Sequence, residues 1–145
     1  MRLMLVASLG LTAALFTAAF ASSATYWTQG ANWSNRLAII PPGASLFLFA
    51  LLLAVSVLSI MASLIMVSRR GPLLASALIS TEPIVVTLPF LVLLANSNVV
   101  FTHPWNGEIM HGAAELAARL AATGLAFTGL SVVLTFGAYV GRLGR

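Results

Sequence analysis

Acidic and imidazole side chains are the groups in this chain with the clearest capacity for chemistry, and they are few. Three acidic residues and two histidines occur among 145 residues, with no Asp, Lys or Cys. Glu82 stands alone in an apolar run, whereas His103, Glu108, His111 and Glu115 lie in one short segment. The chain lacks residues for Schiff-base, thiolate and most hydrolytic chemistry. We therefore expect no enzymatic activity and no cofactor.

Glu82 lies about ten residues into its apolar run, which places it roughly 15 Å deep if that run is a transmembrane helix. An ionised carboxylate at such a depth costs about 2.5–3.5 kcal/mol on insertion scales. The side chain should therefore be neutral, paired, or beside a wet cavity. Two hypotheses remain open: a coupling carboxylate for proton or cation transport, with Pro83 opening the backbone beside it, or a neutral Glu bonded to a neighbouring helix.

The segment around Glu108-x-x-His111 suggests a second kind of site. This spacing is the one used by di-iron four-helix bundles, and His103 and Glu115 are further candidate metal ligands. Such bundles use two of these motifs plus further carboxylates, which this chain does not have. The alternative is a polar helix face turned toward protein or headgroups, on which Glu115 and Arg119 form an i,i+4 intramembrane ion pair.

The composition indicates that these residues are held by transmembrane helices. Sixty per cent of the residues are hydrophobic and 7% are charged, whereas about a quarter of a soluble domain is charged. Mean hydropathy is +1.03. Four apolar runs are long enough to cross a bilayer, so the sequence predicts an all-α bundle of four transmembrane helices in a single domain, residues 1–145. The predicted spans are 3–21, 46–67, 73–95 and 113–140, with outer loops at 22–45 and 96–112.

The basic residues predict the orientation of this bundle. All seven are arginines, and all but Arg36 and Arg119 flank the spans on one side, so the positive-inside rule places both termini inside. No basic patch suited to nucleic acid is present. We expect an integral protein of the plasma or inner membrane, with an organellar membrane as the alternative. If Ala19-Phe20-Ala21 is a signal-peptide cleavage site, three spans remain. The arginines are Arg2, Arg36, Arg69, Arg70, Arg119, Arg142 and Arg145.

The last span contains glycines that suit close helix packing in lipid, namely Gly124, Gly129, Gly137 and Gly141. The leading hypothesis is accordingly a non-catalytic structural or accessory subunit, which packs its helices in a homo-oligomer or a larger membrane complex. A small proton- or cation-coupled transporter using Glu82 is one alternative, and a metal-binding subunit with an outer-side His/Glu site is another. We expect the third and fourth spans to face protein and the second to face lipid.

Overall fold

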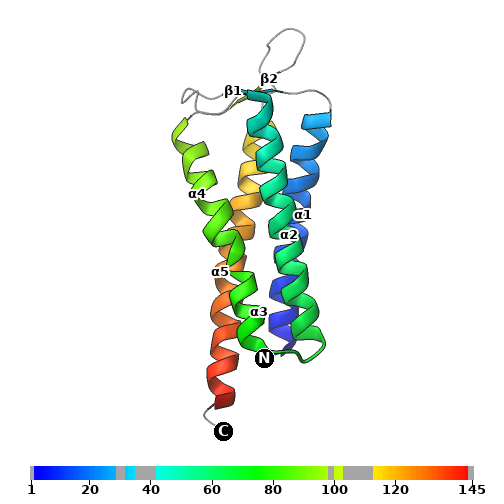
Figure 1. Cartoon of the computed structure of the whole chain (residues 1–145), viewed down its shortest axis with the longest axis vertical. Helices are drawn as coiled ribbons and strands as arrows, with labels where there is room; N and C mark the ends of the chain where they lie inside the picture. Colours follow the sequence, from blue (N-terminus) through cyan, green and yellow to red (C-terminus); the bar gives the residue numbers. More distant parts are fainter. Residues whose placement is uncertain (1, 29–31, 35–41, 98–99, 103–112, 144–145) are drawn as a thin grey trace.

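The fold is a bundle of long helices, seen in a computed structural model (Figure 1). The structure describes residues 2–28, 32–34, 42–97, 100–102 and 113–143, with side chains described over 2–25, 47–92 and 116–143. In chain order the elements are α1 (Arg2–Thr28), β1 (Asn32–Ser34), α2 (Pro42–Ser68), α3 (Leu73–Ser80), α4 (Glu82–Ser97), β2 (Val100–Thr102) and α5 (Ala113–Leu143).

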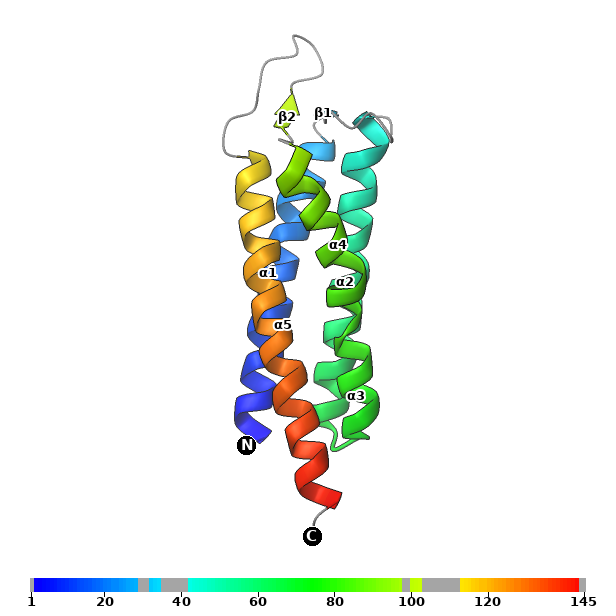
Figure 2. The same ribbon diagram turned by 90° about the vertical axis from the view of Figure 1, so that its left-hand side faces the viewer.

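The predicted fold class is confirmed, because the described residues contain four apolar helices long enough to cross a membrane. The spans are Arg2–Thr25, Phe47–Ser68, Leu73–Val92 and Leu116–Leu143. Both ends of the chain and the α2–α3 turn lie at one end of the bundle, and the two strands lie at the other (Figures 1 and 2). The chain is an integral membrane protein, while the side of the membrane that each end faces stays a prediction.

The third span is not one continuous helix. It breaks at Thr81 into α3 and α4, and Pro83 follows in the first turn of α4, where its missing N–H is tolerated. The Thr81 carbonyl accepts hydrogen bonds from the N–H groups of Ile84 and Val85 at 3.0 and 3.1 Å. Beyond the break α4 leans outward (Figure 1) and packs more lightly against α5 than α3 does.

The two long loops are joined by a small sheet that the sequence did not predict. Strands β1 and β2 pair antiparallel, with Asn32 opposite Thr102, Trp33 opposite Phe101 and Ser34 opposite Val100. Each strand has three residues, which is too short for a periodicity signal to be visible in the sequence. The pairing links the segment after α1 to the segment before α5 at the end of the bundle opposite the termini (Figure 1).

Among the described residues, α1 and α5 form the most extensive contact of any pair of helices. The Phe16 ring is fully buried and lies over the bare backbone of Gly124, where an added Cβ would come within 3.1 Å of the ring. Further along the same interface, the Ser8 and Ser131 hydroxyls share a hydrogen bond of 2.6 Å. Small residues let helices approach closely in lipid. Gly124 therefore lies in the contact between α5 and α1, while a role for it in packing against other membrane helices stays a prediction.

We predict that Gly124→Leu destabilises the bundle, because the larger side chain displaces the Phe16 ring. Overpacking of this kind costs about 1–3 kcal/mol, measurable as thermal unfolding in detergent. Gly129→Leu is the matched control, since an added Cβ there has no atom within 4 Å. Combining Gly124→Leu with Phe16→Ala should restore part of the loss. Equal destabilisation by Gly124→Leu and Gly129→Leu would contradict this account of the interface.

A polar seam around Glu82

The interface between α2 and the α3–α4 pair is lined with hydroxyl groups. We call this the polar seam, and its members are Ser56, Ser59 and Ser63 of α2 with Ser76, Glu82 and Thr87 of α3 and α4. Residues 56, 59 and 63 recur at helical spacing, which puts them on one face of α2. The seam therefore corresponds to serines at helical spacing in α2, a pattern that is easy to overlook because the rest of the run is apolar.

Two hydrogen bonds close the seam on either side of its centre. The Ser63 and Ser76 hydroxyls are 2.5 Å apart, and Ser63 also donates to the Ser76 carbonyl at 3.0 Å. Toward the other end, the Ser56 and Thr87 hydroxyls are 2.8 Å apart. Ser56, Ser63, Ser76 and Thr87 are fully buried. These pairs satisfy the polar groups that lipid would otherwise leave without partners.

Glu82 lies between these two pairs, close to the midpoint of the span. From Leu73 to Glu82 the helical rise is about 14 Å, and from Glu82 to Val92 it is about 15 Å. Its carboxyl group lies close to the Ser59 and Ser56 hydroxyls. Both carboxyl oxygens are buried, and neither meets the geometry of a hydrogen bond. The Glu82 carboxyl group thus has buried oxygens with serine hydroxyls nearby, but no hydrogen bond to either oxygen.

This arrangement can do two things chemically. A carboxyl surrounded by hydroxyl oxygens can take up and release a proton, or contribute to an all-oxygen cation site of the kind that hard cations prefer. It can equally accept a hydrogen bond from a donor on another membrane chain. No basic side chain approaches Glu82 among its described partners, so an ion pair within this part of the chain does not account for it.

The second predicted cluster falls mostly outside the described residues. His103, Glu108 and His111 lie there, and so does the side chain of Glu115, whose backbone is in the first turn of α5. Within the described part of the chain, no group of three or more His, Cys, Asp or Glu residues could hold a metal ion. The metal site and the Glu115–Arg119 ion pair both stay predictions.

The predicted packing glycines of α5 occupy different environments. Gly124 contacts Phe16 of α1, whereas an added Cβ at Gly129, Gly137 or Gly141 would have no atom within 4 Å. Gly137 and Gly141 are exposed on the outside of the bundle. Any packing role for these three glycines must therefore involve a molecule other than the described part of this chain, and it stays a prediction.

We predict different stability effects for two substitutions in the seam. Ser63→Ala removes a donor to Ser76 and should cost about 0.6 kcal/mol, the average for hydrogen bonds between membrane helices. Glu82→Gln breaks no hydrogen bond within the bundle and should leave unfolding of the detergent-solubilised monomer unchanged. If Glu82→Gln destabilises the monomer more than Ser63→Ala does, the carboxyl has a partner within the chain.

Comparison with known proteins gives no further guide to the site. No family model matches the chain, and no match was found among curated proteins or solved structures. The function has to be inferred from the residues and their arrangement.

Proposed function

We propose that this protein is a non-catalytic membrane subunit that acts by packing α1 and α5 against other membrane helices, from further copies or from a larger complex. The observation that carries the proposal is a difference in the size of outward-facing side chains around the bundle. The scarcity of acidic, basic and imidazole groups across the whole sequence supports a role without catalysis.

One side of the bundle presents mostly large hydrophobic side chains. Between Phe47 and Val67, every exposed residue of α2 is a large hydrophobic. The exposed residues of α3 and of α4 as far as Val92 are large hydrophobics as well, apart from Pro89. Such a surface suits lipid, because lipid tails are as apolar as leucine and give large side chains no reason to prefer protein. The exposed residues are Phe47, Leu51, Val55, Leu58, Met61, Ile65, Leu74, Leu78, Val85, Leu88, Pro89 and Val92.

The outward faces of α1 and the first half of α5 are different. Past its first turn, α1 exposes Leu11 as its one large side chain within the described residues. Its other exposed positions are Ala7, Ala14, Thr17, Ala18, Ala21 and Thr25. The first half of α5 exposes Ala122, Thr123 and Ala126 together with Leu116 and Arg119, whereas its second half exposes mostly large hydrophobics. We call the nine alanine and threonine positions the small-residue face. In lipid, small side chains are enriched where another helix approaches closely.

A groove between α4 and α5 adjoins part of this face. It has a volume of about 490 Å³, and Ala122 and Ala126 line it together with Leu88 and Leu125. The groove lies where α4 leans outward from the bundle (Figure 1), and Ala122 and Ala126 present only small side chains to it. A helix from another chain could seat its side chains there. The proposed face thus includes part of the fourth span, through alanine and threonine rather than through its glycines, and it includes α1 where the sequence suggested the third span.

We predict that Ala18→Leu and Ala126→Leu reduce assembly without unfolding the bundle, since both positions are exposed. Gly137→Leu should act in the same direction, because an added Cβ there meets nothing within 4 Å in the chain. Particle mass after extraction in mild detergent, measured by native mass spectrometry, reads out assembly. Val85→Leu, at a position 69% exposed on the lipid-facing side, is the control. A wild-type protein that is monomeric and carries no other chain would contradict the proposal.

Transport is the second candidate, and the unsatisfied Glu82 carboxyl favours it. In the transport hypothesis, the carboxyl takes up a proton or cation at mid-bilayer and the helix break at Thr81 gives the backbone room to move. Purified protein in proteoliposomes should then dissipate an imposed proton or sodium gradient, and Glu82→Gln should abolish this flux. Absence of flux in the wild type, or flux retained in Glu82→Gln, would contradict the transport hypothesis, and the subunit hypothesis would then be the one that remains.

A further inference from the structure

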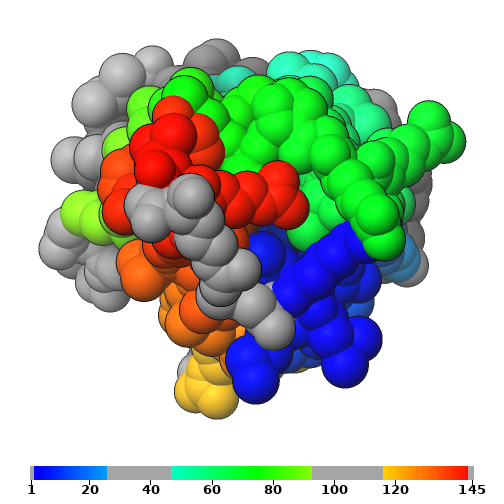
Figure 3. All heavy atoms as spheres, turned by 90° about the horizontal axis from the view of Figure 1, so that it is seen from below, coloured from blue at the N-terminus to red at the C-terminus, as the bar shows by residue number. Residues whose placement is uncertain are grey.

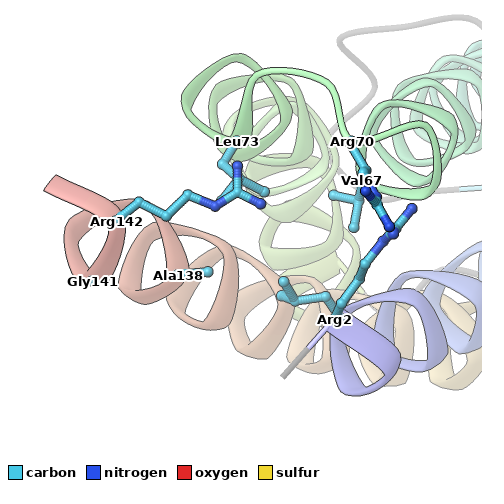
Figure 4. A pocket seen from close by; sticks show the side chains of 8 residues that line it. Arg2, Val67, Arg70, Leu73, Ala138, Gly141 and Arg142 are labelled. Atoms are coloured by element: carbon cyan, nitrogen blue, oxygen red, sulfur yellow. The ribbon is translucent and has the colours of Figure 1, made fainter. Parts of the chain in front are cut away.

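Three arginines from separate parts of the chain surround one hollow at the end of the bundle that holds the termini. Arg2 comes from α1, Arg70 from the α2–α3 turn and Arg142 from α5, and the hollow has a volume of about 290 Å³. Figure 3 views this end of the molecule, and Figure 4 shows the hollow from close by. Its volume is about ten times the share of one water molecule in the liquid, about 30 Å³.

The hollow has a charged rim and an apolar floor. Arg2, Arg70 and Arg142 are exposed, while Leu5 and Val67 beneath them are almost fully buried. In Figure 4 the Arg2 side chain extends toward Arg70, and the Arg142 side chain extends from α5 toward Leu73. A ligand in this hollow would have cations around it and hydrocarbon below it.

No carboxylate from the described residues balances these charges. Glu82 is about 14 Å along the helix from Leu73, in the middle of its span. Glu115 is in the first turn of α5, about 40 Å from Arg142 at the helical rise. Glu108 lies outside the described residues. The three guanidinium groups therefore repel one another, and an anion placed between them would relieve that repulsion.

The backbone of the α2–α3 turn fixes the position of Arg70. The Arg70 N–H donates a hydrogen bond to the Val67 carbonyl at 3.3 Å, and the Gly71 N–H donates to the Met66 carbonyl at 2.8 Å. These two bonds are the pair that defines a Schellman motif at the end of a helix. Arg70 takes the left-handed conformation that this motif requires, with φ of 59°, a cost that glycine would avoid. Arg2 is held as well, because its guanidinium donates to the Ser68 carbonyl. The Arg2 guanidinium and the Arg70 backbone are thus held in place before any ligand binds.

We propose that this hollow binds the phosphate group of an anionic phospholipid. Guanidinium groups pair with phosphate oxygens through two parallel hydrogen bonds. The hollow lies at the ends of the spans, where headgroups are found, and basic pockets between transmembrane helices are known sites for anionic lipids. The apolar floor of Leu5 and Val67 favours a lipid over free phosphate, since it can contact the carbons next to the phosphodiester. This site does not depend on the proposed packing of α1 and α5.

The test is lipid binding by the full chain in a neutral detergent. Phosphatidylglycerol and phosphatidylcholine are titrated in parallel, and bound lipid is counted by native mass spectrometry. We expect retention of phosphatidylglycerol and little of phosphatidylcholine. In the triple variant Arg2→Gln/Arg70→Gln/Arg142→Gln, affinity should fall roughly 100-fold, at about fivefold for each arginine lost near a membrane surface.

Arg69→Gln provides the matched control, because Arg69 is exposed in the same turn but does not line the hollow. It should bind phosphatidylglycerol as the wild type does. Unfolding temperatures without lipid show whether each variant is folded, and the single variant Arg142→Gln replaces the triple variant if the latter is not. Equal retention of both lipids, or equal losses in Arg69→Gln and Arg142→Gln, overturns the proposal. Displacement of the lipid by an equimolar amount of inorganic phosphate would instead assign the site to a free anion.

Discussion

The contact between the Phe16 ring and the backbone of Gly124 fixes how close α1 and α5 can come. In water, burial of apolar surface would drive these helices together, but lipid offers an equally apolar environment. Close packing and interhelical hydrogen bonds therefore supply much of the association. The ring over glycine and the Ser8–Ser131 bond provide both at one interface. The remaining helices are arranged around that pair, with α2 packed on α1 and α3 packed on α5.

The polar seam also reflects the lack of a hydrophobic driving force between helices in lipid, but here hydrogen bonds rather than close packing hold the helices together. Where α2 meets α3 and α4, serine and threonine hydroxyls bond across the interface and leave no unsatisfied donor at Ser63 or Thr87. Glu82 is the exception, since both of its oxygens are buried without a hydrogen bond. A group of this kind in a membrane marks either a function or a missing partner. In the transport hypothesis Glu82 has a function, whereas in the subunit hypothesis its partner is on another chain.

The spans could be predicted from the sequence because their length and lack of charge are properties of each segment by itself. The pairing of the helices could not. A helix that is apolar all round carries little record of which face is inside, so neither the match of Phe16 with Gly124 nor the pairing of Ser56 with Thr87 was visible. Glu82 could be recognised in the sequence as an acidic residue in an apolar run. That its carboxyl oxygens have no hydrogen-bond partner depends on how α2, α3 and α4 pack, which the sequence does not reveal. Likewise, Arg2, Arg70 and Arg142 predicted orientation, whereas their convergence on one hollow required the fold.

The central claim is that the outside of this bundle is divided into a lipid-facing side and a protein-facing side. Because the chain has no cysteine, a single introduced cysteine can carry a photo-activated benzophenone label without background. The label is attached at Ala18→Cys, on the small-residue face, or at Leu58→Cys, on the lipid-facing side. It is then irradiated in the membranes of the cells that make the protein, so that it reacts with whatever lies next to each position. The account predicts protein adducts from residue 18 and none from residue 58. Adducts from residue 58 alone would contradict it.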